Sequence, residues 1–142
     1  WPLVSAIDES FYFKPDSGQI FASPADETPS PPCDAQPEEL DIAITVDRVE
    51  TVTTLQVRQI AHKWAGLRSF VADKSLVVGM DPAAEGFFWL AGQGGYGFQT
   101  APAAARCVAS LIAGTGIPGD IADLGVSAAD LSPARLRNGA TS

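Results

Sequence analysis

The sequence predicts an α+β fold, in which a mostly antiparallel sheet with one packed helix is followed by a strand, a glycine-rich loop and a second helix. Three observations predict this class. Short runs rich in β-branched and aromatic residues flank a turn near the N-terminus. Apolar residues recur at helical spacing between 37 and 51. A continuous apolar run at 87–91 is followed by a glycine-rich stretch and an alanine-rich segment.

The composition is typical of an ordered globular protein. The 142 residues are 46% hydrophobic and include 17 acidic and 9 basic side chains, with a formal net charge of −8. This apolar content supports a core, and the few scattered basic residues argue against a nucleic-acid partner. The sequence contains no uninterrupted apolar run long enough for a transmembrane segment and no basic stretch leading into an apolar one, so we expect neither a membrane span nor a leader peptide.

Cysteine and histidine are too scarce to form a zinc site. Cys33 and Cys107 are far apart in the sequence, and His62 is the single histidine. Since a zinc ion needs about four ligands, no metal site is expected, and the two thiols are expected to be free. Sparse cysteine is typical of a reducing compartment, so we expect a cytoplasmic protein. For His62 a solvated or structural role is favoured over a functional one.

The N-terminal part is predicted to form strands at residues 3–7, 10–14 and 19–23. A turn over Pro15–Gly18 joins the second and third strands into a hairpin, with Gly18 able to adopt a positive φ. Residues 24–36 contain four prolines and predict a solvated loop.

A helix is predicted to start at Pro37 and to end near Thr51. Proline suits the first helical position, and the adjacent carboxylates Glu38 and Glu39 complement the positive end of the helix dipole. One face is expected to contain Leu40, Ala43, Ile44 and Asp47, and the apolar stripe is broadened by Ile42, Val46 and Val49.

Three more strands are predicted downstream. The first covers 64–72 and contains Gly66, which would let another backbone approach. The second covers 76–80 after a turn at 73–75, and the third covers 87–91 with an apolar pattern typical of burial on both faces.

The glycine loop at 92–97 leads into a helix from Phe98 to about Ala113, which Gly114 and Gly116 terminate. One short helix is predicted near 128–131.

The strand, glycine loop and helix over 87–113 form the most informative feature for function. Glycines allow close backbone approach, and the unpaired N–H groups at a helix start favour partial negative charge. The spacing is not a dinucleotide fingerprint, because no βαβ unit with a suitably placed acidic residue follows it. The loop could therefore bind a ligand or could serve only as a turn.

Residues 85–102, Glu-Gly-Phe-Phe-Trp-Leu-Ala-Gly-Gln-Gly-Gly-Tyr-Gly-Phe-Gln-Thr-Ala-Pro, resemble the C-terminal flavin-contacting segment of the FAD-dependent D-amino-acid oxidase superfamily. Asp8–Pro15 and Trp64–Phe70 resemble substrate-domain strands of its D-arginine dehydrogenase-like branch. The resemblance extends from Trp1 to about Leu136.

Members of that superfamily begin with a Rossmann part containing G-x-G-x-x-G, which is absent from this sequence. The resemblance therefore implies a C-terminal fragment of a flavoprotein. Residues 1–85 would belong to the substrate-binding domain, and residues 86–142 would return to the FAD-binding domain. We expect the fragment alone to be inactive.

The resemblance also implies residue roles. Arg68 would pair with the carboxylate of a D-amino acid, Tyr12 would donate its hydroxyl to the same carboxylate, and the carbonyl of Gly95 would accept from the substrate amine. The backbone that would face the flavin belongs to Gly94, Gly95, Tyr96, Gly97, Phe98 and Gln99. Hydride would pass from the substrate Cα to FAD, giving an imine that hydrolyses to the 2-oxo acid and ammonia, with no catalytic nucleophile in this chain.

Plainer interpretations remain open. Arg68 could form a surface ion pair, Tyr12 could pack in a core, and Glu85 could lie on the surface. The whole protein could be a dehydrogenase or oxidase of D-amino acids, with a basic side chain such as that of D-arginine, or a glycine or sarcosine oxidase of the same superfamily. A stand-alone α+β binding domain is the alternative outside enzymes. The expected partners are the substrate, the missing N-terminal FAD-binding part, and a second copy paired through exposed strand edges.

Overall fold

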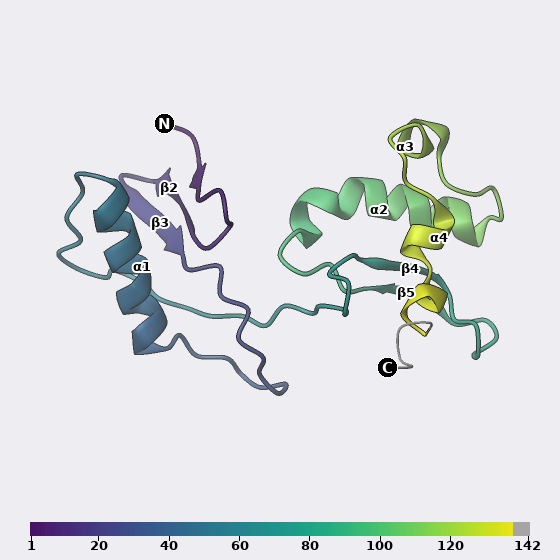
Figure 1. Ribbon diagram of the computed structural model, residues 1–142, viewed down its shortest axis with the longest axis horizontal. Coiled ribbons are helices and arrows are strands. Elements are labelled where there is room, and N and C mark those ends of the chain that lie inside the picture. Colours follow the sequence, from purple (N-terminus) through teal and green to yellow (C-terminus); the bar gives the residue numbers. More distant parts are fainter. Residues whose placement is uncertain (138–142) are drawn as a thin grey trace. The chain divides into compact units, whose positions relative to one another are not determined.

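The computed structural model describes residues 1–137, and the chain divides into two compact units between Leu67 and Arg68. Each unit has its own small antiparallel sheet with helices, which confirms the α+β class (Figure 1). The expected functional boundary between residues 85 and 86 concerns the domains of a larger protein, so it stays a prediction.

The first unit contains a three-stranded antiparallel sheet in the order β1-β2-β3. Its strands are β1 (Val4–Ser5), β2 (Tyr12–Asp16) and β3 (Gln19–Ser23), close to the predicted ranges. The hairpin turn has positive φ angles of 49° at Ser17 and 82° at Gly18, which suits the twist of paired strands. The strands therefore pair up to the turn, and Pro15 lies within β2 opposite Ile20 rather than in a wider turn.

Helix α1 (Glu39–Val52) packs on this sheet, but with a different face from the predicted one. Val49 is only 2% exposed and joins a core cluster with Phe11 and Phe13, whereas Leu40 is 67% exposed. The buried face of α1 thus contains Val49, a residue that was expected only to broaden the apolar stripe of the helix. Pro37 also lies outside the helix, because Glu38 is the N-cap residue.

The predicted strand over 64–72 is wrong. Residues 55–71 form neither helix nor strand, and Trp64 and Leu67 are 67% and 50% exposed. A strand requires a neighbour along its length, and no described strand pairs with this segment. Gly66 has nothing within 4 Å of the position that a Cβ would take, so the backbone approach expected there is also absent.

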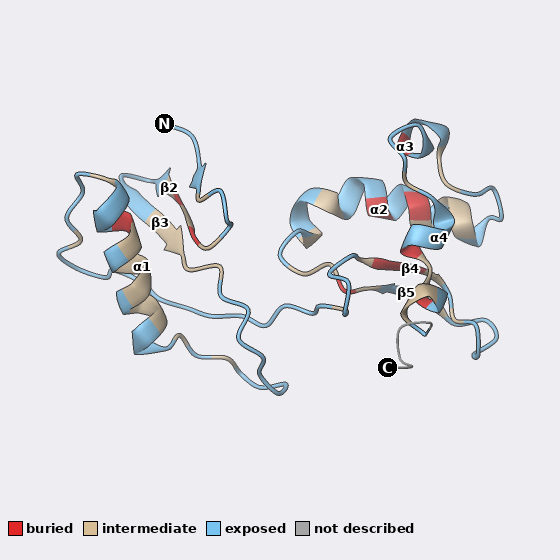
Figure 2. Ribbon diagram, viewed as in Figure 1, coloured by how far each residue is buried: buried red, intermediate tan, exposed pale blue. Residues whose placement is uncertain are grey.

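The second unit is built on the antiparallel pair β4 (Val77–Met80) and β5 (Phe88–Ala91). Helix α2 (Gly97–Ile112) packs against β4, as do the short helices α4 (Ala128–Leu131) and η1 (Pro133–Leu136). Helix α3 (Gly119–Ala122) lies between α2 and α4 in the sequence. The buried core cluster consists of Val78, Cys107, Ile121 and Leu131 (Figure 2).

The expected burial of β5 on both faces is wrong, since Trp89 and Leu90 are 38% and 46% exposed. Among the described residues, β5 has one strand neighbour, β4. The predicted helix at 128–131 is confirmed, and Ser127 and Asp130 form a capping box at its start. Gly114, with φ 72°, follows the end of α2 as expected. In the part of the chain that the structure describes, every helix is too short or too polar to cross a membrane.

Candidate functional site

The loop between β5 and α2 is shaped by glycines in left-handed backbone conformations. Gly92 has a φ of 69° and Gly94 a φ of 55°. A side chain at either position would be strained, because the left-handed region brings Cβ close to the backbone. Residues 92–96 therefore follow a path that most other residues would resist.

The segment Arg68–Val71 lies directly against this loop. A Cβ at Gly92 would lie 3.0 Å from Val71 Cγ1, and one at Gly94 would lie 2.8 Å from Phe70 Cε1. The backbone N–H of Gly94 also donates to the carbonyl of Ser69, with the two atoms 3.0 Å apart. The glycines thus let a second stretch of backbone approach the loop, which is the role that the sequence had suggested for Gly66.

Arg68 completes this contact at the end of the loop nearest α2. Its Nη1 lies 3.1 Å from the position that a Cβ of Gly95 would take. The guanidinium carbon lies 5.1 Å from the centroid of the Phe70 ring, within the range of a cation–π interaction. Arg68 is exposed, and its planar guanidinium has the donor geometry that suits a carboxylate. The structure therefore brings together Arg68, Gly94 and Gly95 among the predicted site residues.

The other predicted cofactor-contacting residues lie at the start of α2. Tyr96 is the N-cap residue, and the helix start has no side-chain cap. Since the first N–H groups of a helix have no partner within the helix, the amides of Gly97, Phe98 and Gln99 point toward the region before it. Phe98 is fully exposed and Tyr96 is 45% exposed. This helix start offers donors and the positive end of the helix dipole.

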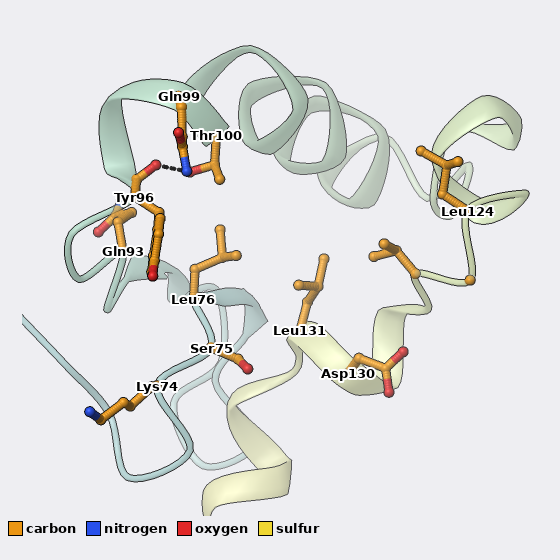
Figure 3. Close-up of a pocket in the computed structure, with 12 residues that line it drawn as sticks. Lys74, Ser75, Leu76, Gln93, Tyr96, Gln99, Thr100, Leu124, Asp130 and Leu131 are labelled. Atoms are coloured by element: carbon orange, nitrogen blue, oxygen red, sulfur yellow. Dashed lines mark hydrogen bonds between the residues drawn. The ribbon is translucent and has the colours of Figure 1, made fainter. Parts of the chain in front are cut away.

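An open pocket of about 380 Å³ lies beside the same helix start (Figure 3). Leu76 and Leu131 supply apolar surface, and the hydroxyl of Thr100 donates to the carbonyl of Tyr96 at 2.8 Å. The lining residues are Lys74, Ser75, Leu76, Gln93, Tyr96, Gln99, Thr100, Leu124, Gly125, Val126, Asp130 and Leu131. The pocket therefore includes Tyr96 and Gln99, whereas the contact between Arg68 and Gly95 lies outside its lining.

Hydrogen bonds fix the sheet that feeds the loop. Asp81, at the end of β4, accepts from the indole N–H of Trp89 at 2.8 Å and from the amides of Ala83 and Ala84. These bonds, the Trp89 bond foremost, lower the pKa of Asp81 below its usual value. Likewise, hydrogen bonding from Arg135 lowers the pKa of Asp73. Arg135 also donates to the carbonyl of Ser75 at 2.6 Å, so the chain after α4 is tied to the turn before β4.

Tyr12 lies in the other unit, on the central strand of its sheet. Its neighbours Phe11 and Phe13 are buried in the core, so the alternation along β2 puts Tyr12 on the opposite face. There its ring lies 6.1 Å from Phe21, which in turn lies 5.6 Å from Trp64. Tyr12 is therefore not a core residue, and its part in substrate binding stays a prediction.

The remaining candidates show no clustering. His62 and Glu85 are exposed. Cys33 and Cys107 are free thiols, the first exposed and the second buried in the core of the second unit. Within residues 1–137, no group of three or more histidine, cysteine, aspartate or glutamate side chains is arranged to hold a metal ion.

Sequence reasoning missed Phe70 and Val71, which fill the space that the glycines leave. The available signal was the glycine spacing itself, since Gly92 and Gly94 alternate with other residues as in a backbone that another segment approaches. The glycine spacing left a ligand site and a plain turn open, whereas in the structure the side chains of Val71 and Phe70 occupy the space beside Gly92 and Gly94.

The family comparison agrees with this part of the chain. The model of the FAD dependent oxidoreductase family matches residues 1–111. The match includes both Tyr12 and the unit of β5, glycine loop and most of α2. The match supports the superfamily and FAD as the cofactor. It does not distinguish the D-arginine dehydrogenase-like branch from others in the superfamily.

Proposed function

The chain belongs to the FAD-dependent oxidoreductase family, and we propose that it is the C-terminal portion of an enzyme that oxidises D-amino acids. It would contribute a carboxylate-binding arginine from the substrate-binding part, residues 1–85. It would also contribute a flavin-facing loop from the part that returns to the FAD-binding domain, residues 86–142.

The proximity of Arg68 to the glycine loop carries this proposal. Nη1 of Arg68 lies 3.1 Å from the Cβ position of Gly95, so a carboxylate held by the guanidinium would sit beside the loop. The guanidinium fork matches the two oxygens of a carboxylate, which a lysine ammonium does not. The neighbouring carbonyl of Gly95 would accept a hydrogen bond from the substrate amine, and Tyr12 would add a hydroxyl donor to the carboxylate.

The residues of the loop and helix start fit the flavin that the family uses. The backbone of Gly94–Gln99 combines glycines with an uncapped helix N-terminus, which favours negative charge on a neighbouring ring system. When bound, FAD supplies the oxidising chemistry, in which the hydride on the substrate Cα is removed and the imine hydrolyses in water to the 2-oxo acid and ammonia. The protein's own part is to bind the carboxylate, orient Cα and supply these donors.

Exposed apolar side chains near the loop support the proposal that another part of the enzyme covers it. Phe98 is 100% exposed and Leu90 is 46% exposed. Large exposed apolar side chains of this kind mark interaction surfaces when they gather. In the proposed enzyme the N-terminal FAD-binding part would cover them, and in its absence two copies would associate through the free edges of β4 and β5.

The proposal is tested on the full-length gene product. We expect a yellow protein heavier than 14.8 kDa, whose flavin absorbance bleaches under anaerobic conditions when a D-amino acid is added. A panel that covers basic, acidic and apolar D-amino acids, together with glycine and sarcosine, would identify the substrate. A colourless product would contradict the proposal and favour a stand-alone binding domain. Bleaching by glycine or sarcosine alone would favour an amine oxidase of the same family.

Arg68 variants test the proposed carboxylate site. Arg68→Lys keeps the charge but loses the two-pronged geometry, so we expect KM for the D-amino acid to rise by roughly tenfold or more, with a smaller change in kcat. Arg106→Lys is the matched control, because Arg106 pairs with Asp120 on the surface at 2.7 Å. It is expected to leave both parameters near those of the wild type. Equal KM values in Arg68→Lys and the wild type would rule out this role for Arg68.

A further inference from the structure

We propose that Phe70 is a positioning residue, whose ring holds the Arg68 guanidinium beside Gly95 and is itself held against Gly94. This inference rests on the proposed function, in which Arg68 binds the substrate carboxylate. Phe70 would not touch the substrate but would act through the arginine.

The first observation is the contact between the two side chains. The guanidinium carbon of Arg68 lies 5.1 Å from the centroid of the Phe70 ring. An arginine has many rotamers, and contacts with neighbouring groups select among them. The ring face attracts the cation and so favours rotamers that keep the guanidinium beside the loop.

The second observation is that one edge of the Phe70 ring lies against the loop, while the side chain as a whole is 36% exposed. Cε1 and Cδ1 of Phe70 lie 2.8 Å and 3.1 Å from the position that a Cβ of Gly94 would take, so the ring edge rests on the bare Cα of that glycine. The preceding residue is fixed as well, because the Gly94 amide donates to the Ser69 carbonyl at 3.0 Å. These backbone and ring contacts thus set the position of Phe70 relative to the glycine loop.

Together these contacts form one chain from the loop to the guanidinium. Gly94 locates Phe70, Phe70 locates Arg68, and Arg68 lies 3.1 Å from the Cβ position of Gly95. Any group that binds between Arg68 and the loop would therefore meet a guanidinium whose direction is set in advance. Pre-set donors bind a ligand with a smaller loss of conformational freedom.

The test uses the full-length flavoenzyme and compares a D-amino acid with its amide, which lacks the carboxylate. The measured quantity is the ratio of kcat/KM for the acid to kcat/KM for the amide. In Phe70→Leu the ring is lost but an apolar side chain remains, so we expect this ratio to fall by roughly threefold to tenfold, mainly through KM. Phe70→Tyr keeps the ring and is expected to restore the ratio.

Phe87→Leu is the matched control, since Phe87 is a half-exposed aromatic residue whose ring packs on Trp89. It should keep the wild-type ratio. An unchanged ratio in a flavin-loaded Phe70→Leu enzyme, or an equal fall in Phe87→Leu, would overturn the positioning role alone. A wild-type enzyme that oxidises no D-amino acid would overturn the proposed function and this inference with it. If Phe70→Leu loses its flavin, Phe70→Met gives the same comparison with a longer side chain.

Discussion

Gly94 has two independent reasons to be glycine. Its φ of 55° lies in the left-handed region, and the space that a Cβ would occupy is filled by the Phe70 ring at 2.8 Å. Gly66 has neither constraint, since no heavy atom lies within 4 Å of its Cβ position. The two glycines look alike in the sequence, but only one of them meets another segment.

We therefore predict that Gly94→Ala destabilises the protein by at least about 2 kcal/mol, because a left-handed alanine is strained and its methyl group would displace the ring. Gly66→Ala is the matched control and should change the free energy of unfolding by less than about 1 kcal/mol. Denaturant midpoints measured with unchanged slopes would check both values. Equal midpoints for the two variants would show that Phe70 moves away without cost.

Asp81, at the end of β4, makes a pH-dependent contribution to the stability of the fold. Hydrogen bonds from Trp89, Ala83 and Ala84 lower its pKa in the folded state below the usual 3.8. A carboxyl with a lowered folded-state pKa stabilises the fold above its unfolded pKa, and this contribution is lost as the pH falls through the folded value. We predict that the denaturant midpoint falls as the pH is lowered below about 4.

Asp81→Asn is expected to weaken this acid sensitivity, since its side chain carries no charge to neutralise. The variant should be less stable than the wild type at pH 7 and closer to it at pH 3. Asp34→Asn, in the exposed loop 24–38, should follow the wild-type curve. If the denaturant midpoints of the Asp81 variant and the wild type changed in parallel with pH, Asp81 would not be a source of the acid sensitivity.

At the scale of elements, those with strong local signals were predictable from the sequence. The β2–β3 hairpin has a turn that glycine favours, α2 ends where Gly114 adopts a positive φ, and the helix at 128–131 begins with a serine cap. These signals act over a few residues and need no distant partner.

Elements that depend on distant partners were not predictable in the same way. The residues 64–72 have strand-like side chains, but pairing is decided by another segment, and none of the described strands pairs with them. The face of α1 was misjudged for the same reason, because Phe11 and Phe13 select Val49 from two neighbouring apolar stripes. The proximity of Arg68 to the loop followed only from the family resemblance, whereas the contribution of Phe70 required coordinates.

The corrected face of α1 leads to a prediction. Val49→Ala removes two methyl groups from a site that is 2% exposed, so we expect it to cost about 2 kcal/mol of unfolding free energy. Leu40→Ala removes more atoms, but from a side chain that is 67% exposed, and should cost less than about 0.5 kcal/mol. Thermal or denaturant unfolding measures both. A larger loss of unfolding free energy in Leu40→Ala than in Val49→Ala would show that the face containing Leu40 packs on the sheet.

At the scale of the whole molecule, each unit leaves large apolar side chains exposed. Trp64 and Leu67 in the first unit are 67% and 50% exposed, and Phe98 in the second unit is 100% exposed. Large exposed apolar side chains mark interaction surfaces when they gather. Their exposure agrees with the proposal that further parts of a larger enzyme cover them.

The segment 55–71 allows this proposal to be tested by proteolysis. Arg58 and Lys63 are exposed and lie in backbone without helix or strand, where proteases cut most readily. Arg106, by contrast, lies within α2, whose backbone hydrogen bonds must open before a protease can bind the chain there. We predict that trypsin first cuts the 142-residue chain after Arg58 or Lys63, and that mass spectrometry identifies these sites before any cut at Arg106.

In the full-length gene product the same two sites should be protected, since the proposed enzyme buries the apolar side chains around them. Protection acts through the population of the open form, so the cleavage rate at Arg58 and Lys63 should fall by roughly tenfold or more while cuts in other exposed loops continue. Arg58→Gln together with Lys63→Gln would confirm that the early fragments arise at these positions. Equal cleavage rates in the two forms would show that the segment stays uncovered, and the exposed apolar side chains would then need another partner, such as a second copy of the chain.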